Sequence, residues 1–544
     1  MSVTAAAARP PGNPLGAVAR GGSFAALGSG AGSILGFVLT LVVTRGLSTA
    51  SAGQFFSATA VFIVLQTFLS FGVGAGLVRF VPRFGVLGRH CDVPALLAVA
   101  FVPVAVLAVL GTIGLWFAAP VLAARVGHDD SSAALSSFRV LALLFLPGML
   151  ELAAVECTRA FGSIRNYVLV QQLAVPALRP LFVGLGVAFG APLWVLVLAW
   201  MVPLVLALVV AAAIVGQCLK QSYGRRLAWP ERSTSVRGIA MEYWRFTAAR
   251  GLSSVMEILL NWLDILLVAT MASAAQAAVY AAASRFITSG TLVLQALRLA
   301  IAGDVSAALA RRDTERVSQI YHVASQWVVL SSWPLYLVMA VFAPTVLAIF
   351  GSSYPTGASA LTVLCVAMLL NLAAGNVGTV LLMGGKSSWV LADKGASLAI
   401  NVAANLVLVP RFGITGAAVA WAVTIVLDSG LAFAQVRWGM GIGGRLRGIT
   451  IAGLLALGCF GVLPLAVRVV FGSSLPTMLA GVALGLICYL PLAWMGRDML
   501  GVRALIQGFT SRGAQSVDGA QAGRLMATHR VERSCGSEEL RRKK

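Results

Sequence analysis

Long apolar runs alternate with short polar segments along most of the chain, from residue 22 to residue 496. A helix needs roughly 20 apolar residues to cross a bilayer, and the runs are of this length. The pattern therefore predicts an all-α polytopic membrane protein with about fourteen transmembrane helices. The predicted spans are 22–44, 53–78, 94–119, 134–157, 166–190, 191–215, 246–271, 276–303, 322–349, 357–383, 388–409, 412–436, 448–470 and 475–496.

Composition agrees with this pattern and excludes a soluble protein. Of the 544 residues, 59% are hydrophobic and 11% are charged, whereas a soluble domain has about 25% charged residues. The first apolar run ends at Arg45 without a small-residue cleavage pattern. We therefore expect this run to be retained as a first span, and not to be removed as a signal peptide.

The formal net charge is +21, and its placement indicates the topology. With the N-terminus inside, the cytoplasmic segments hold 30 of the 40 Lys and Arg residues, the external segments hold four, and six lie within spans. This asymmetry follows the positive-inside rule and predicts that both termini are cytoplasmic. We expect a multi-pass protein of the cell inner (cytoplasmic) membrane, and no nucleic-acid partner is needed to explain the basic excess.

Two pairs of stretches resemble each other at an offset near 225 residues. The first pair is AGQFFSATAVFIVLQTFLSFG around Phe55 and AAVYAAASRFITSGTLVLQAL around Tyr280. The second pair is YVLVQQLAVPALRPLFVGLGVAFG from Tyr167 and WVLADKGASLAINVAANLVLVPRFG from Trp389. A parallel pseudo-repeat of two six-helix bundles would give this pattern, with a site at their interface near the bilayer midplane. Chance similarity between Ala- and Leu-rich helices is the alternative.

The predicted organisation has six parts. Outside the repeat, two C-terminal helices complete the membrane region, and the composition of the polar, basic tail predicts disorder. The parts are a cytoplasmic N-terminal segment (1–21), an N-terminal six-helix lobe (22–215), a basic cytoplasmic linker (216–245), a C-terminal six-helix lobe (246–436), transmembrane helices 13 and 14 (448–496) and a basic cytoplasmic tail (497–544).

Several short motifs carry a family likeness over residues 22–496. The stretch LGSGAGSILGFVLTLVVTRGLSTASAGQFF, followed by LSFGVGAGLVRFVPRF, is similar to the opening of bacterial polysaccharide flippases. The stretches IFGSSYPTGASALTVLCVAMLL and LLMGGKSSWVLADKGASLAINVAANLVLVPRFGITGAAVAWAV resemble the second half of the same family. These flippases are the polysaccharide transporter branch of the multidrug/oligosaccharidyl-lipid/polysaccharide exporter superfamily.

The resemblance implies two six-helix bundles that form a V around a central cavity, with two extra helices in the flippase branch. Fourteen spans therefore favour a flippase over drug antiporters of the superfamily, which usually have twelve. The lipid II flippase of peptidoglycan synthesis is also fourteen-helical and remains an alternative. Its first two helices are rich in arginine, whereas the first span here is free of charge until Arg45.

Charged residues inside the spans are the candidates for function, because a charge that faces lipid costs roughly 2.5–3.5 kcal/mol. In span 246–271, polar residues recur at helical spacing and form one stripe, which comprises Arg250, Ser254, Glu257, Asn261 and Asp264. The substrate-binding candidates are Arg250, Arg298, Arg179 and Arg285, since arginine can bind a lipid-linked pyrophosphate in a bidentate manner. The ion-coupling candidates are Glu257, Asn261 and Asp264, because a partly desolvated carboxylate can carry a proton or bind sodium.

The structural alternative is that opposite charges neutralise each other and fix the helix register. Comparable depth in neighbouring helices predicts a salt bridge or a shared water between Asp264 and Arg285, and Arg179 is predicted to pair with Glu151. Arg250 and Arg298 lie at one depth and are expected to face each other. A further expected network comprises Asp393, Lys394 and Asp428, while Lys394, Ser397, Asn401 and Asn405 share one face.

The sequence favours a flippase that carries polyprenyl-pyrophosphate-linked oligosaccharide units across the inner membrane by alternating access for cell-surface polysaccharide synthesis. A cation-coupled multidrug antiporter and a lipid II flippase are alternatives, and a membrane polysaccharide polymerase fits less well because every external loop is short. We expect no enzyme activity, no cofactor and no metal site. The expected partners are the lipid-linked glycan, membrane lipids and other polysaccharide-assembly membrane proteins.

Overall fold

The computed structural model describes residues 14–127, 131–162, 164–223, 235–443 and 447–496, and these residues form helices and no strands. The first part of the chain forms α1 (Pro14–Gly46), α2 (Thr49–Ser70), α3 (Val73–Val86), η1 (His90–Asp92), α4 (Val93–Val126), α5 (Ser131–Ala160), α6 (Ile164–Tyr167), η2 (Val168–Ala174), α7 (Val175–Ala188) and α8 (Leu193–Tyr223). The second part forms α9 (Val236–Met271), α10 (Ala274–Ser289), α11 (Thr291–Ala310), α12 (Thr314–Val341), α13 (Ala343–Leu347), η3 (Ala348–Phe350), η4 (Tyr354–Gly357), α14 (Ala358–Ala374), α15 (Val377–Met383), α16 (Ser387–Ala434), η5 (Gln435–Gly439), α17 (Arg447–Ala456), η6 (Leu457–Val462), α18 (Leu463–Phe471) and α19 (Leu475–Met495).

The all-α fold confirms the class predicted from the apolar runs, but the count of fourteen spans is not confirmed. In the described part of the chain, twelve helical stretches are long and apolar enough to cross a membrane. One of them, Ser387–Gly439, is 53 residues long and covers two predicted spans. The predicted span 276–303 is divided between α10 and α11.

Glycines mark the breaks that separate these helices. Gly413 has a φ of 54° and a ψ of −134°, which folds the chain back within α16 at the place where two spans were predicted. A left-handed backbone of this kind favours glycine, which has no Cβ to clash. A second break lies between α2 and α3, where Phe71 and Gly72 both have positive φ.

Polar side chains fix the start of several helices. Ser48 accepts a hydrogen bond from the backbone N–H of Ser51 at the start of α2, and Ser235 accepts one from Gly238 at the start of α9. Such caps satisfy backbone donors that the first turn of a helix leaves open. The cap at Ser235 shows that α9 begins inside the predicted linker 216–245. At the other end of that linker α8 continues to Tyr223, and residues 224–234 lie outside the described residues.

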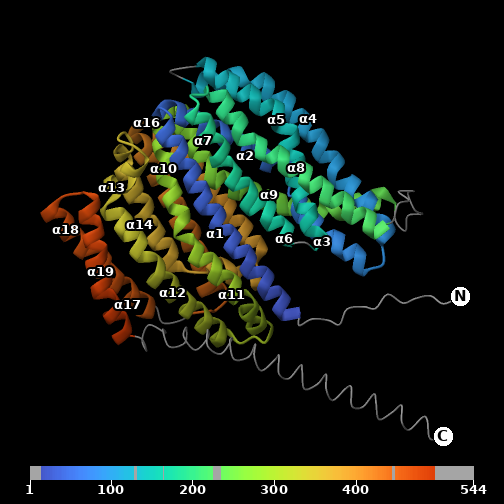
Figure 1. Ribbon diagram of the computed structural model, residues 1–544. Coiled ribbons are helices and arrows are strands. Elements are labelled where there is room, and N and C mark those ends of the chain that lie inside the picture. Colours follow the sequence, from blue (N-terminus) through green and yellow to red (C-terminus); the bar gives the residue numbers. More distant parts are fainter. Residues whose placement is uncertain (1–13, 128–130, 163, 224–234, 444–446, 497–544) are drawn as a thin grey trace, which may run out of the picture.

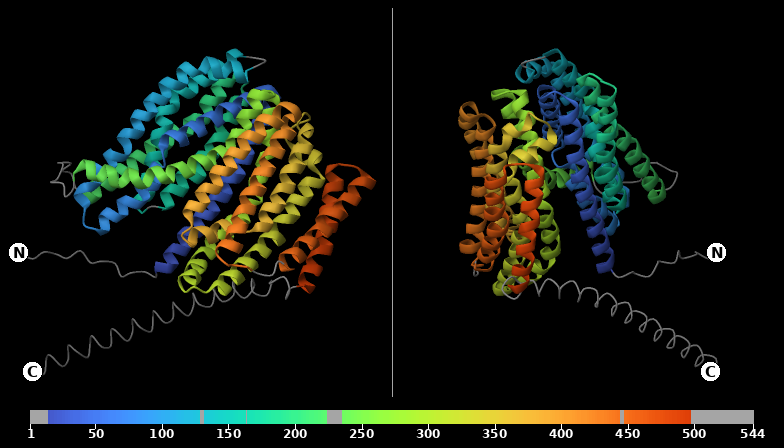
Figure 2. Two further views of the ribbon diagram at one scale, coloured as in Figure 1. Left: turned by 180° about the vertical axis from the view of Figure 1, so that it is seen from behind. Right: turned by 60° about the vertical axis from the view of Figure 1, so that its left-hand side comes forward.

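The helices gather in two groups with three further helices at one side (Figures 1 and 2). In the first group α5 packs on both α4 and α8, and α1 packs on α7. In the second group α14 packs on α12 and α16, and α10 also contacts α14. The helices α17, α18 and α19 form the side layer and lie against α12. We call the end at which α1 begins and α19 ends the termini end, and the opposite one the far end.

Helix α9 belongs to both groups. Near its start, Tyr243 Oη donates to the carbonyl of Val73 at 2.8 Å and Trp244 Nε1 donates to that of Val99 at 3.2 Å, so this half packs on α3 and α4. The other half packs on α10 and α16. Gly251 lies where α9 crosses the α2–α3 break, because a Cβ there would meet Phe71 at 2.4 Å. The predicted lobe boundary at residue 246 therefore falls inside a helix shared by the two groups.

The two groups meet at the far end. The stretches predicted to be repeats, α2 and α10, pack on each other, and a Cβ at Gly53 would lie 1.7 Å from the carbonyl oxygen of Ala274. Arg45 on α1 donates through Nε to the carbonyl of Ile349 at 2.7 Å. These contacts hold the first group to the second at this end.

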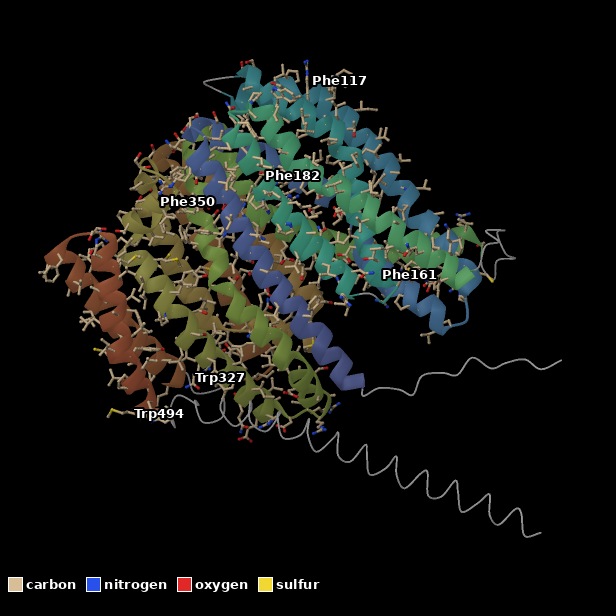
Figure 3. All side chains as sticks on the ribbon, in the orientation of Figure 1. Phe117, Phe161, Phe182, Trp327, Phe350 and Trp494 are labelled. Carbon is tan, nitrogen blue, oxygen red and sulfur yellow. The ribbon has the colours of Figure 1, made fainter. Side chains whose placement is uncertain are left out.

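Large apolar side chains also point outward from the bundle (Figure 3). Phe117 on α4 is 76% exposed and Trp494 on α19 is 57% exposed. A soluble protein rarely exposes apolar surface on this scale, whereas a surface in contact with lipid chains is apolar. The exposed side chains therefore agree with a multi-pass membrane protein.

Candidate functional site

Two residues of the polar stripe of α9, Asn261 and Asp264, line a cavity inside the second group. The cavity has a volume of about 310 Å³ and lies between α9, α10, α14 and α16. Its lining residues are Asn261, Trp262, Asp264, Ile265, Tyr280, Ser284, Arg285, Ile287, Leu364 and Trp421. The sequence-predicted residues Asn261, Asp264 and Arg285 thus come together at one cavity.

Asp264 supplies the carboxylate of this cavity and is buried, with 2% of its surface exposed. Tyr280 Oη donates to its Oδ2 at 3.0 Å, and Asn405 Nδ2 donates to its Oδ1 at 2.9 Å. Asp264, Tyr280 and Asn405 lie on α9, α10 and α16, respectively. A carboxylate can remain charged away from water only if it keeps hydrogen bonds or an opposite charge. Tyrosine and asparagine supply those bonds here.

The predicted salt bridge between Asp264 and Arg285 is wrong. Within the described residues, Asp264 bonds to Tyr280 and Asn405 and forms no ion pair with Arg285. The Arg285 guanidinium instead lies 5.1 Å from the ring centroid of Trp262. Both charged residues line the same cavity, and a water shared between them stays a prediction.

A second cavity of about 180 Å³ lies further along the same face of α9. Glu257 and Asn261 line it from α9, and Lys394 and Asp428 line it from the two arms of α16. Lys394 Nζ lies 2.6 Å from Asp428 Oδ2. The expected network is confirmed for this pair.

Asp393 belongs to a separate contact. Its Oδ1 accepts a hydrogen bond from Gln435 Nε2 at 2.7 Å. The expectation that Asp393 joins Lys394 and Asp428 directly is therefore not met, because Asp393 and Lys394 are neighbours on a helix and point about 100° apart.

Arg285 also reaches a third cavity, of about 370 Å³, on the side of the first group. That cavity is lined from α1 by Ser29 and Ser33 and from η2 by Gln171 and Gln172. The η2 segment is a π-helix, a form that is rare and occurs often at functional sites. Arg285 thus lies between the two groups, with neutral hydroxyl and amide groups on one side and Asp264 on the other.

Arg179 lies inside the first group, away from these cavities. Its guanidinium lies 4.1 Å from the ring centroid of Trp200 on α8. No ion pair within 4.0 Å joins it to Glu151 in the described part of the chain, although the two charges interact electrostatically. The predicted pairing is present only as this longer-range interaction.

Arg250 and Arg298 are exposed and lie on α9 and α11. Arg250 is next to Gly251, where α9 crosses the α2–α3 break. Neither residue lines any of the three cavities described above. The structure does not bring them to Arg285.

Sequence reasoning missed two aromatic residues of the first cavity, Tyr280 and Trp421. A signal for Tyr280 was present: Asp264 and Tyr280 lie almost symmetrically about the tight turn that ends α9 at Met271 and begins α10 at Ala274. Residues placed in this way on antiparallel helices lie at the same depth. No comparable signal exists for Trp421, whose position depends on the fold of α16 at Gly413.

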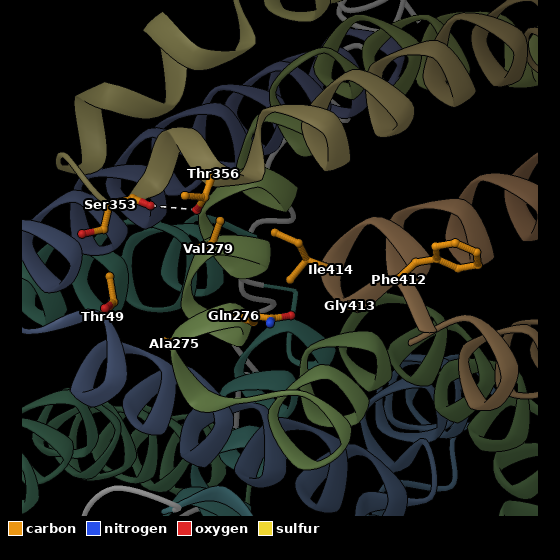
Figure 4. A pocket seen from close by; sticks show the side chains of 9 residues that line it. All are labelled: Thr49, Ala275, Gln276, Val279, Ser353, Thr356, Phe412, Gly413 and Ile414. Atoms are coloured by element: carbon orange, nitrogen blue, oxygen red, sulfur yellow. Dashed lines mark hydrogen bonds between the residues drawn. The ribbon is translucent and has the colours of Figure 1, made fainter. Parts of the chain in front are cut away.

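A further cavity, of about 470 Å³, lies at the far end (Figure 4). Neutral polar side chains from three elements line it, including Thr49 of α2, Gln276 of α10 and Thr356 of η4. Thr356 Oγ1 donates to the carbonyl of Ser353 at 2.8 Å. No charged side chain lines the cavity within the described residues, and the cavity adjoins the contact between α2 and α10.

Taken together, the central cavities can bind a ligand without covalent chemistry. Arg285 offers a planar cation for a phosphate group, and Asp264 offers a shielded anion. The indoles of Trp262 and Trp421 offer flat apolar faces of the kind that contact sugars or cations.

Comparisons with known proteins show the family and the fold of this chain. A family model described as Polysaccharide biosynthesis protein matches residues 18–299, which is more than half of the chain. A comparison with curated protein sequences gives no significant match.

Three solved structures share the fold. One is a multidrug resistance MATE family transporter of the MOP superfamily in an inward-facing conformation, with a TM-score of 0.61, 17% identity and coverage of 77% of this chain and 96% of that chain. Another is the lipid II flippase MurJ in an inward closed conformation, with a TM-score of 0.65, 11% identity and coverage of 86% and 98%. The third is a MOP superfamily transporter from Pyrococcus furiosus, with a TM-score of 0.53, 17% identity and coverage of 81% and 97%.

These likenesses confirm the membrane-transporter fold that the motifs implied. At such identities they concern the fold alone, while the family model rests on the sequence itself. The chain belongs to the polysaccharide biosynthesis protein family and has the fold of the MOP superfamily transporters.

Proposed function

We propose that this protein is a flippase that moves polyprenyl-pyrophosphate-linked oligosaccharide units from the inner to the outer leaflet of the inner membrane. The family and the fold support a transporter that serves polysaccharide synthesis. The observation that carries the proposal is the position of Arg285, which lines cavities on both sides of the boundary between the two groups of helices. A pyrophosphate bound to Arg285 would lie between the two groups of helices and could contact residues of both.

In this proposal Arg285 binds the pyrophosphate, and the serine and glutamine side chains of the third cavity face the sugars. Charge-assisted bonds from arginine to phosphate are short and strong, so Arg285 would fix the head group while the polyprenyl tail stays in lipid. Arg250 and Arg298 would attract the head group earlier on its path, because they are exposed on α9 and α11. Arg179 would contribute its charge from inside the first group.

The proposed lobes follow the two groups, with α9 as the helix that joins them. The far end is closed by Gly53 against Ala274 and by Arg45 on the carbonyl of Ile349. Alternating access requires these contacts to separate while α9 remains packed on both groups of helices. No bond of the substrate is made or broken in this cycle.

We propose that Asp264 couples the cycle to a proton or sodium gradient, together with Glu257 and Asn261. Asn405 Oδ1 lies beside Asp264, is buried and accepts no hydrogen bond among the described residues. Carboxylate and amide oxygens are the ligands that hard cations such as sodium prefer. Glu257 and Asn261 line the adjoining cavity and would give the ion its path.

A second candidate, a cation-coupled multidrug antiporter, is favoured by one observation. Trp262, Tyr280 and Trp421 surround Asp264 in the first cavity. Aromatic rings around a carboxylate suit an organic cation, because the ring faces attract positive charge.

Deletion of the gene separates these candidates. The flippase proposal expects the loss of one cell-surface glycan, with its lipid-linked units accumulating on the cytoplasmic side. Altered drug tolerance with a normal glycan would support the antiporter, and a defect confined to peptidoglycan would support a lipid II flippase. Units that reach the outer face but stay unpolymerised would support a polymerase. Each of these three results would contradict the proposal.

A further inference from the structure

A groove lies between α3 and α9 at the termini end, apart from the central cavities. Its volume is about 590 Å³, and cationic, aromatic and apolar side chains line it. The lining residues are Arg79, Phe80, Arg83, Gly238, Met241, Glu242, Arg245 and Phe246. Three of these eight side chains carry a positive charge and one carries a negative charge.

The single carboxylate of the groove is shared between two arginines. Glu242 Oε1 lies 3.1 Å from Arg83 Nη1, and Glu242 Oε2 lies 3.4 Å from Arg89 Nη1. In the described part of the chain, neither Arg79 nor Arg245 has a carboxylate within ion-pair distance. Two guanidinium groups in one groove therefore have no countercharge among the described residues.

An aromatic ring holds one of these two guanidinium groups in place. The Arg79 guanidinium carbon lies 4.1 Å from the ring centroid of Phe246 and 5.8 Å from that of Phe80. Stacking of this kind covers a face of the guanidinium and leaves the N–H groups at its edge available. Such a planar edge is suited to the oxygens of a phosphate.

The groove also has an apolar side. Met241 lines it and is 63% exposed, and the rings of Phe80 and Phe246 line it as well. Met241 lies on α9, which is long and apolar enough to cross a membrane, so its exposed side chain is accessible to lipid. A ligand with a phosphate and apolar chains fits this combination. The phosphate would contact the arginines, and the apolar chains would contact the apolar side chains.

We propose that this groove binds the phosphate of an anionic phospholipid, with Arg79 and Arg245 as its ligands. The lipid would tie the first half of α9 to α3, and α9 carries Asp264 at its other end. Anionic lipid would therefore stabilise the observed packing of α9 on the first group. This inference does not depend on which molecule the protein transports.

Thermal unfolding of the purified full-length protein in detergent tests the proposal. Dioleoylphosphatidylglycerol should raise the melting temperature more than dioleoylphosphatidylcholine at the same concentration. Arg245→Gln should weaken the apparent affinity for phosphatidylglycerol by about fivefold, because one basic residue near an anionic lipid contributes about that factor. Arg245 is exposed and has no ion pair in the described residues, so this variant should fold normally.

Two further variants serve as a control and as a test with the opposite expected effect. Arg316→Gln removes an exposed arginine of α12 outside the groove and should leave the lipid response unchanged. Glu242→Gln should tighten phosphatidylglycerol binding, because it removes the carboxylate that competes with the lipid phosphate. An unchanged lipid response in both Arg79→Gln and Arg245→Gln would overturn the proposal. So would an equal thermal shift from inorganic phosphate alone, since the source would then not be a lipid.

Discussion

Asn405 of α16 donates its side-chain amide to Asp264 of α9, with 2.9 Å between Asn405 Nδ2 and Asp264 Oδ1. With Tyr280 of α10 on the other carboxylate oxygen, three helices of the second group meet at one buried charge. The same helix α9 packs through its first half on α3 and α4. The hydrogen bonds of Asp264 therefore fix, within the second group, a helix that also packs on the first group.

Asp264→Asn should abolish the dependence of transport on an ion gradient. The amide has the size of the carboxylate but carries no charge, so it cannot take up a proton and cannot balance the charge of a bound sodium ion. The measurement is translocation by proteoliposomes with and without a sodium or proton gradient. Tyr280→Phe is the control, because it removes one hydrogen bond, costs about 0.5–1.5 kcal/mol of stability and keeps the charge. Full gradient dependence in Asp264→Asn would refute the coupling role.

Arg250→Ala and Arg298→Ala should each abolish complementation of a deletion strain while protein levels stay normal. Both side chains are exposed, so their loss should not disturb packing. Arg139→Ala is the matched control, because Arg139 is also an exposed arginine within a helix and lies over the ring of Trp116, at 5.3 Å, away from the cavities. Normal glycan in both of the first two variants would remove them from the substrate path.

Arg179→Gln and Glu151→Gln should be coupled in stability. Each single change leaves one charge in the interior of the first group without its opposite, whereas the double change removes both charges. We expect the double variant to be more stable than the sum of the singles by about 0.5–3 kcal/mol. Thermal unfolding of the four proteins of this cycle gives the coupling energy. Strict additivity would show that the two charges do not compensate each other.

Gly53→Ala should open the far end. A Cβ at this position would lie 1.7 Å from the carbonyl oxygen of Ala274, so α2 and α10 must move apart. We expect a loss of about 1–3 kcal/mol and faster maleimide labelling of a cysteine placed at Val279 in the far-end cavity. Gly30→Ala is the control, because nothing lies within 4 Å of its added Cβ. Equal labelling in the two variants would mean that α2 and α10 do not close this end.

Periodicity predicted the polar face of the site correctly. The spacing of Glu257, Asn261 and Asp264 placed them on one side of a helix, and these three residues line the adjoining cavities. The face shared by Ser397, Asn401 and Asn405 is buried, as that spacing indicates. Such faces can be predicted because helical geometry alone determines them.

Pairing between helices was harder to predict. Counting from the middle of each span gives the depth of a residue but not its direction around the helix axis. It therefore predicts Arg285 as the partner of Asp264, whereas Tyr280 makes the direct contact. The sharing of α9 between the groups was also missed. Its apolar run requires only that it cross the membrane, and close contacts at Gly251 decide which helices it touches.

Translocation by proteoliposomes tests the central claim most directly. A polyprenyl-diphosphate-linked oligosaccharide is added to one leaflet, and its sugars are followed by their accessibility to a glycosidase on the other side. The account predicts transport by the unaltered protein and a loss of at least about tenfold in Arg285→Ala, since truncating a buried charge that binds an opposite charge costs 2–5 kcal/mol or more. Transport by Arg285→Ala at the unaltered rate would contradict the claim that the lipid-linked pyrophosphate passes between the two groups of helices.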